Sequence, residues 1–354
     1  MYIKQMMCFL AKNKELNTIP FKKQKYMSNM EQKLDKIDKK ILAELDKNCR
    51  ISDSELAKKV RRSRQTIAYR IIRLVSSGII TGFFTSINPN KMGYTIFKIY
   101  LKLKNVPQRK DALLKHLKSL NSVYWIGESD GSWDLVFAVY SKDFYRFYEI
   151  KNQIFSLFKD ILIDLYGDIL LDVKQYPKMY FDYEIQKPVQ FGGEIKNSDL
   201  DELDHKILEL MVSNARATTV EIAKTVSSTP ITVSARLKKM EKLGVIIQYR
   251  IGVDLVKLGY EHYKAIIKVE SYSKEEEKQL LEYCSQIPQI QYFIRNIWQI
   301  EPEFVVKNYE EYYQIINKLK ERFPNIIRSI DTVLLRTDEW TPGYNVLLTS
   351  IEQK

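Results

Sequence analysis

The stretch SRQTIAYRIIRLVSSG at positions 63–78 decides the fold. Its apolar residues Ile67, Ile71 and Leu74 recur at helical spacing, and a serine stands where a helix N-cap belongs, so a helix is predicted over Arg64–Ser76. The final glycine is typical of a helix end. The opposite side of this helix carries arginines and no acid. The stretch therefore predicts an amphipathic helix with a basic outer face.

Two shorter helices are predicted upstream, over Lys36–Lys47 and Ser52–Val60, and Ser52 with Glu55 has the spacing of a capping box. The β-rich run Ile79–Ile87 follows and suits a two-stranded wing. Three short helices, a tight second turn and a hairpin describe a winged helix-turn-helix. The third helix of such a module enters the major groove of DNA.

The chain contains an internal repeat. An offset of 166 residues aligns Leu34–Tyr94 with Leu200–Tyr260 without a gap, and 19 of the 61 positions are identical. Pro230 takes the place of Arg64 after a capping Thr229, and Val245–Val253 takes the place of the first wing run. The chain is therefore a duplicated unit of about 165 residues.

The second half of each unit shows the order βαββαβ, which is the ferredoxin-like arrangement. In the first unit the predicted elements are Thr95–Lys104, Asp111–Leu120, Val123–Glu128, Trp133–Tyr140, Asp143–Leu157 and Ile161–Val173. In the second they are His262–Val269, Lys274–Ile287, Ile290–Arg295, Ile300–Lys307, Tyr309–Phe323 and Ile326–Arg336.

The predicted fold class is α+β, a tandem duplication of a winged helix-turn-helix and a ferredoxin-like domain. The predicted segments are a basic tail (1–33), helix-turn-helix 1 (34–94), ferredoxin-like domain 1 (95–175), a linker (176–198), helix-turn-helix 2 (199–260), ferredoxin-like domain 2 (261–340) and a C-terminal tail (341–354). Val346–Leu348 suits a short extra strand. The tail at 1–33 suits an arm that contacts phosphates, and a translation start at Met27 or Met30 fits equally well.

Charge is concentrated near the start of the chain. The net charge of +12 divides into +5 for residues 1–33, +7 for 34–94, +2 for 95–198, +1 for 199–260 and −3 for 261–354. A basic chain usually has a polyanionic partner, most often nucleic acid. The sequence therefore predicts that double-stranded DNA binds chiefly to the first module and more weakly, if at all, to the second.

Arginine is suited to phosphate and to guanine because its fork donates two parallel hydrogen bonds, and glutamine can read adenine. The predicted DNA contacts are Arg61, Arg62, Arg64, Gln65, Thr66, Tyr69, Arg70 and Arg73, with Thr232, Arg236 and Lys239 in the second copy. The simpler interpretation is a solvated helix face. We prefer DNA contact because the stretch offers these arginines no acidic partners, and we expect the row to be exposed and unpaired.

Other classes of protein lack support in the sequence. No run approaches the roughly 18 apolar residues of a membrane span, and the first residues do not have the pattern of a signal peptide. Cys8, Cys49 and Cys284 stand alone, and the three histidines do not cluster. We therefore predict a cytoplasmic protein that is not an enzyme and has no metal site, cofactor or disulfide framework.

The sequence resembles the Lrp/AsnC, or feast/famine, transcription regulators. The resemblance covers nearly all of residues 34–340 and rests on 34–42, 48–50, 55–57, 66–74 and 77–80, with VSARL at 233–237 in the second copy. It implies DNA-binding regulators whose ferredoxin-like halves pair through their sheets into dimers and often bind amino acids between subunits. Two units in one chain fit either an internal pseudo-dimer or a homodimer that pairs like copies.

The resemblance also implies an effector crevice formed by a Gly and an Asp between the second and third ferredoxin strands. Gly131 and Asp134 stand there, and a plain hairpin turn followed by an edge acid is the simpler interpretation. The second copy has no glycine at that place, between Asn296 and Glu301.

Siroheme decarboxylases are the competing class, since they have the same two-part fold and also occur as fused pairs. Their pattern has a His in the hairpin region and an Arg-Arg-Phe-Gly run after the helix-turn-helix. This chain has no His near Gly131 or Trp298, and the corresponding runs read ITGFF at 80–84 and IIQYR at 246–250. The sequence therefore favours the regulator.

Overall fold

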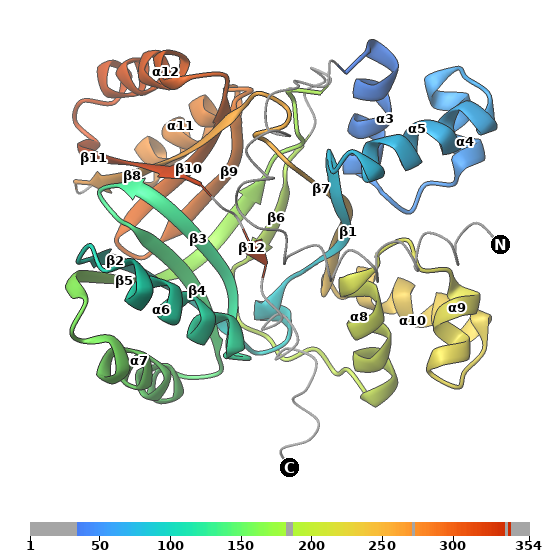
Figure 1. Cartoon of the computed structure of the whole chain (residues 1–354), viewed down its shortest axis with the longest axis horizontal. Coiled ribbons are helices and arrows are strands. Elements are labelled where there is room, and N and C mark those ends of the chain that lie inside the picture. The colour runs from blue at the N-terminus through green and yellow to red at the C-terminus, as the bar shows by residue number, and fades with distance from the viewer. Residues whose placement is uncertain (1–33, 182–186, 271–272, 337–338, 341–354) are drawn as a thin grey trace.

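The computed structural model describes residues 34–181, 187–270, 273–336 and 339–340. The predictions for the two tails, at 1–33 and 341–354, fall outside these residues. Two groups of three helices lie on one side of the molecule, and a curved sheet with its own helices lies on the other (Figure 1). Each half of the chain contributes one three-helix group and half of the sheet.

The predicted helices of both modules are confirmed. The first group is α3 (Lys36–Lys47), α4 (Asp53–Val60) and α5 (Arg64–Ser76), and the second is α8 (Glu202–Ser213), α9 (Thr219–Thr225) and α10 (Pro230–Lys242). Ser52 and Ser63 accept hydrogen bonds from backbone N–H groups at the starts of α4 and α5, as their positions predicted. Gly78 ends α5 with φ of +71°, a conformation that favours glycine.

The predicted hairpin within each copy is wrong, although the wing does have two strands. Each β-rich run forms a single strand, β1 (Ile80–Ile87) or β7 (Ile246–Val253), and these two strands pair antiparallel with each other. A 3₁₀ turn, η2 (Pro89–Lys91), follows β1 where the second wing strand was expected. The two modules are therefore joined by a ribbon to which each copy contributes one strand.

Reciprocal contacts fix this ribbon to the helices of both copies. Arg50 of the first copy donates to the carbonyls of Ala215 (2.6 Å) and Ala217 (2.8 Å). Its counterpart Arg216 donates to the carbonyl of Cys49 (3.1 Å) and to Asp53 (2.9 Å). Because the matched arginines face the opposite copy, the two modules are related by an approximate two-fold axis.

The predicted βαββαβ order is confirmed in both halves. The first half has β2 (Thr95–Leu103), α6 (Pro107–Ser119), β3 (Val123–Gly131), β4 (Leu135–Ser141), α7 (Phe144–Phe158) and β5 (Leu162–Gln175). The second has β8 (Glu261–Val269), α11 (Lys274–Ser285), β9 (Ile290–Asn296), β10 (Gln299–Val306), α12 (Tyr309–Arg322) and β11 (Ile327–Leu335). Helix α6 begins four residues before its predicted start, with a proline in its first turn.

The two half-sheets close into one ring of eight strands. Their joints are the seams β5–β9 and β3–β11, each made by one strand from either half. Two short strands extend the ring: β6 (Val189–Gly192) pairs with β5, and β12 (Glu339–Trp340) pairs with β3. Because β6 lies in the predicted linker (176–198), part of that linker belongs to the sheet. Of the two arrangements that fitted the sequence, the structure has the two copies paired within the chain.

The ring encloses a buried charged cluster that is shared by both halves. Lys98 of β2 and Lys264 of β8 both pair with Glu301 of β10, and Lys264 also pairs with Glu303 (2.8 Å). All four side chains are almost completely buried. Burial alone would raise the pKa of Glu301, but the two lysines outweigh burial and lower the pKa to about 2.

The acids of this cluster come only from the second half. In the register of β2 and β4, Tyr100 lies opposite Val136 and Lys98 opposite Ala138. In the second half, β10 carries Glu301 in the place of Val136 and Glu303 in the place of Ala138, and Glu303 lies opposite Lys264 of β8. Lys98 therefore finds its acid on the other half of the chain, and burial lowers the pKa of Lys98 to about 8 although Glu301 opposes that shift.

Candidate nucleic-acid interface

The first helix-turn-helix presents the start of α5 to solvent. Ser63 accepts a hydrogen bond from the Thr66 backbone N–H (3.1 Å), and the two hydroxyl groups lie 2.8 Å apart. Arg61, at the end of α4, adopts a left-handed backbone with φ of 57°. This conformation turns the chain sharply between α4 and α5. Thr66, predicted as a DNA contact, is half-buried, and its hydroxyl is engaged with the cap.

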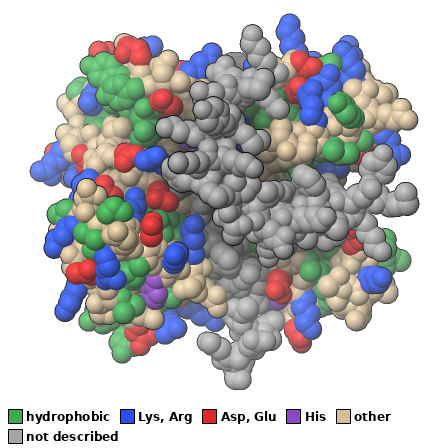
Figure 2. Space-filling model, in the orientation of Figure 1, with side chains coloured by type: hydrophobic (Ala, Val, Ile, Leu, Met, Phe, Trp, Pro, Cys, Tyr) green, Lys and Arg blue, Asp and Glu red, His purple; other side chains and the backbone are tan. Residues whose placement is uncertain are grey.

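The outward side chains at this turn are Arg61, Arg62, Arg64, Gln65 and Tyr69, all of which are exposed. Arg62 donates only to the neighbouring Arg61 carbonyl (2.9 Å), and no carboxylate of the described residues pairs with the three arginines. The positive end of the α5 dipole adds to their field. Lys and Arg side chains also gather over α3, at the top right of Figure 2. This surface can attract and bind a polyanion.

Arg70 and Arg73 do not belong to that free row. Arg70 pairs with Asp35 (2.6 Å) and Asp38 (2.8 Å), and Arg73 pairs with Asp38 (2.5 Å). Only 17% of the Arg70 side chain is exposed. The expectation of an unpaired row is therefore wrong for these two residues, because carboxylates at the start of α3 neutralise them. They hold α5 against α3.

The second copy has the equivalent ion pairs between its helices. Arg236 pairs with Asp201 and Asp204, and Lys239 pairs with Asp204 (2.8 Å). Thr232 lies 2.9 Å from the cap hydroxyl of Thr229, as Thr66 does from Ser63. The three residues predicted as DNA contacts in this copy are thus all engaged within the protein.

The sequence repeat indicates these ion pairs between the helices. Asp35, Asp38 and Arg70 match Asp201, Asp204 and Arg236 at the same spacing. An acid pair and an arginine that persist together in two diverged copies indicate a contact between them. The sequence next to Arg70 holds no acidic partner, because its carboxylates lie 32 and 35 residues away.

The hairpin predicted to line an effector crevice is tightly packed. Asp134 accepts a hydrogen bond from the Leu103 backbone N–H (2.8 Å) and pairs with Lys102 (3.0 Å). Gly131 has φ of +118°, and a Cβ there would lie 2.5 Å from the Thr332 carbonyl oxygen of β11. Gly131 thus permits the close approach of β3 and β11, whereas Asp134 holds the hairpin against β2.

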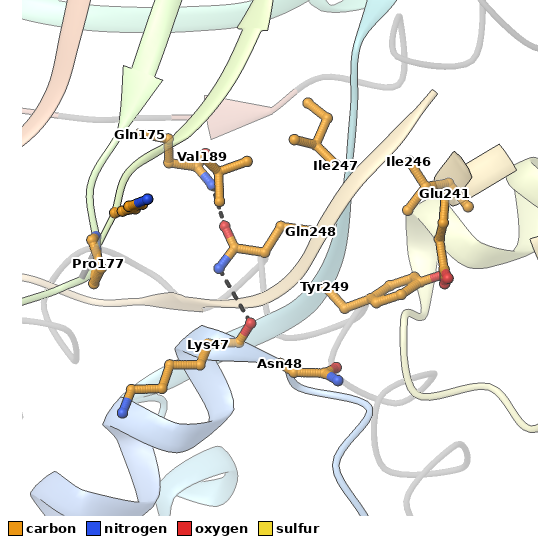
Figure 3. A pocket seen from close by; sticks show the side chains of 11 residues that line it. Lys47, Asn48, Gln175, Pro177, Val189, Glu241, Ile246, Ile247, Gln248 and Tyr249 are labelled. Carbon is orange, nitrogen blue, oxygen red and sulfur yellow. Dashed lines mark hydrogen bonds between the residues drawn. The ribbon is translucent and has the colours of Figure 1, made fainter. Parts of the chain in front are cut away.

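A pocket of about 490 Å³ lies between α3, β7 and the segment around β6 (Figure 3). Gln175 donates to Gln248 (2.6 Å), and Gln248 donates in turn to the Lys47 carbonyl (3.3 Å). Gln248 thus accepts from Gln175 and donates to the end of α3, so its amide is engaged within the protein.

The described residues offer no group of three His, Cys, Asp or Glu side chains that could hold a metal. His116 lies on α6, His205 on α8 and His262 on β8, where it faces Glu303 at 3.3 Å. Cys49 and Cys284 are buried free thiols. Within the residues described, no helix is both long and apolar enough to cross a bilayer.

The paired three-helix modules define a helix-turn-helix protein, and the comparisons agree. A winged helix-turn-helix DNA-binding family model matches residues 34–81 and 200–247. The transcriptional regulator Ptr1 of Methanocaldococcus jannaschii is 37% identical over 110 residues, which cover 31% of this chain and 74% of Ptr1. The regulator LrpA of Bacillus subtilis is 41% identical over 63 residues, 18% of this chain and 46% of LrpA. The chain belongs to the Lrp/AsnC family of helix-turn-helix transcription regulators.

The whole duplicated architecture has a counterpart of known structure. The siroheme decarboxylase NirDL matches with a TM-score of 0.60 over 90% of this chain and 100% of NirDL, at 12% identity. At this identity the likeness concerns the fold alone. It supports the predicted α+β architecture of two units.

Proposed function

We propose that the chain regulates transcription in the cytoplasm by binding duplex DNA, mainly through the start of α5. The observation that carries this proposal is the cluster of Arg61, Arg62 and Arg64, which is exposed and free of carboxylate partners in the described part of the chain. Arginines at a helix start can reach phosphates and base edges in the major groove. Arg70 and Arg73 contribute indirectly, because they hold α5 in place.

The test is the double variant Arg62→Ala/Arg64→Ala in the full chain. Removal of one phosphate-binding side chain reduces the slope of log affinity against log salt by about one. We expect weaker binding at low salt and a slope flatter by about two, since two such side chains are removed. Gel shift or fluorescence anisotropy at several salt concentrations measures both quantities.

Arg328→Ala is the matched control, because it removes one exposed arginine from β11 on the ring. It should leave the affinity and the salt slope unchanged. An Arg62→Ala/Arg64→Ala variant that binds like the unchanged protein would contradict the assignment of α5 as the DNA-binding helix.

We infer that the chain is not an enzyme, although its fold is shared with a siroheme decarboxylase. The hairpin between β9 and β10 presents Ile297 and Trp298, and the one between β3 and β4 presents Gly131 and Asp134. Neither carries a histidine that could serve as an acid or base. Purified protein should therefore show no tetrapyrrole absorbance, and a Soret band that co-purifies would revive the enzyme alternative.

We assign Gly131 to the β3–β11 seam and Asp134 to a contact with β2, and neither residue to an amino-acid site, because both are engaged within the protein. Isothermal titration with the twenty amino acids tests this assignment. Binding that Asp134→Asn abolishes, in a variant that still folds, would overturn it.

A further inference from the structure

The two recognition helices, α5 and α10, are alike where they contact the protein. Both begin at a hydroxyl cap that also contacts a threonine hydroxyl, and both are tied to an acid pair through a matched arginine. Aliphatic or sulfur-containing side chains fill the matched buried positions: Ile67, Ile71 and Leu74 in α5, and Val233, Leu237 and Met240 in α10. The scaffold has therefore been kept in both copies.

The same helices, together with the turns that precede them, differ where they face outward. Arg61, Arg62, Arg64, Gln65 and Tyr69 in the first copy correspond to Ser227, Ser228, Pro230, Ile231 and Ala235 in the second. Three cations and an amide are thus replaced by hydroxyl groups and apolar side chains. Ile231 is 82% exposed at the second position of α10, where α5 carries Gln65.

These two surfaces suit different base edges. Guanidinium and amide groups donate to guanine and adenine, whereas an aliphatic side chain contacts the C5-methyl group of thymine. A single exposed isoleucine is ordinary on a protein surface. Ile231 differs because it stands at the start of a recognition helix, on the face that α5 uses for its polar side chains.

One molecule presents one surface of each kind. The β1–β7 ribbon, the reciprocal arginines and both seams of the ring join the first copy to the second within the chain. A dimer of identical single units would present two equal recognition helices. Here the approximate two-fold axis relates two unequal ones.

We infer that the target is a duplex with two unlike half-sites, one read by α5 at purine edges and one read by α10 at thymine methyl groups. This inference rests on the proposed function. It concerns the base sequence of the target DNA, and it predicts that this sequence is not a palindrome.

The first experiment selects bound duplexes from a random library with the full chain and then compares three pairings of the recovered half-sites. With A for the half-site of α5 and B for that of α10, we expect A–B to bind tightest. A–A and B–B should each bind about ten-fold or more weakly, because several base pairs are mismatched. A palindromic consensus, or A–A binding as tightly as A–B, would overturn the inference.

The second experiment replaces the thymines of half-site B with uracil, which lacks the methyl group. Affinity should fall about three- to five-fold for each thymine methyl group that Ile231 touches. Ile231→Ala should cause a similar decrease on the thymine duplex and no further decrease on the uracil duplex. Equal uracil effects in both proteins would show that Ile231 does not read the methyl group.

The controls separate this inference from the proposed function. Val256→Ala, which removes an exposed aliphatic side chain outside the recognition helices, should leave binding unchanged. Gln65→Ala should alter the preference at half-site A alone. A chain that binds no duplex refutes the proposed function, whereas one that binds a palindrome refutes only the unlike half-sites.

Discussion

Residues of the recognition helices have two different roles, although they lie close together in the sequence. Arg64 and Arg70 both lie on the basic face of α5, yet Arg64 is exposed and Arg70 is paired with two carboxylates. Burial would raise the pKa of Asp35, but hydrogen bonds from the Asp38 backbone and from Arg70 lower it below its ordinary value. The composition of a helix face does not distinguish these roles, because the partner acids belong to another helix.

Arg70→Ala should lower the free energy of unfolding by about 2 kcal/mol, because hydrogen bonds to charged groups of this kind are worth about 1.5–3 kcal/mol and Asp38 is almost fully buried. Urea denaturation measures the loss. Arg236→Ala should cause a similar loss in the second copy, and Arg64→Ala should cause almost none. Equal stability of the Arg64 and Arg70 variants would show that the tie to α3 does not contribute.

At the scale of elements, local pattern predicts the helices and strands well and their partners poorly. The apolar period places α5 at its observed bounds, and the repeat supports the register in both copies. The run Ile80–Ile87 is a strand, as predicted, but its partner strand β7 lies in the other copy, from Ile246 to Val253. Strand propensity carries no information about a partner at that distance, so a local hairpin is the natural expectation from sequence.

Gly131→Ala tests the seam between β3 and β11. The new methyl group would lie 2.5 Å from a backbone oxygen of β11 and would also require the positive φ. We expect a loss of about 1–3 kcal/mol, with faster amide hydrogen exchange along β3 and β11. Gly193→Ala is the matched control, since its φ is +85° but nothing lies within 4 Å of the added atom. If both variants lose the same free energy of unfolding, the close approach of β11 does not contribute to the effect.

At the scale of the whole molecule, the buried charges make the two halves depend on each other. Lys98 belongs to the first half, and its acid belongs to the second. Removing one partner of a buried pair costs about 3–5 kcal/mol, because a charge is left without compensation. The sequence does not reveal this cluster, since its members lie on three strands and only the closed ring brings them together.

Glu301→Gln should therefore destabilise the chain by several kcal/mol, on the order of the cost of a broken buried pair. Adding Lys98→Met should recover part of this loss, because the uncompensated cation is then removed. A double-mutant cycle followed by chemical denaturation measures the coupling. Strictly additive losses would show that Lys98 and Glu301 do not stabilise each other.

The covalent connection between the halves has a thermodynamic consequence. A regulator assembled from two separate subunits loses its paired recognition helices on dilution, because dissociation is governed by mass action. In this chain the β1–β7 ribbon and both seams form within one molecule. Occupancy of a promoter should therefore rise in proportion to the number of copies in the cell, without the steeper threshold that a subunit equilibrium imposes.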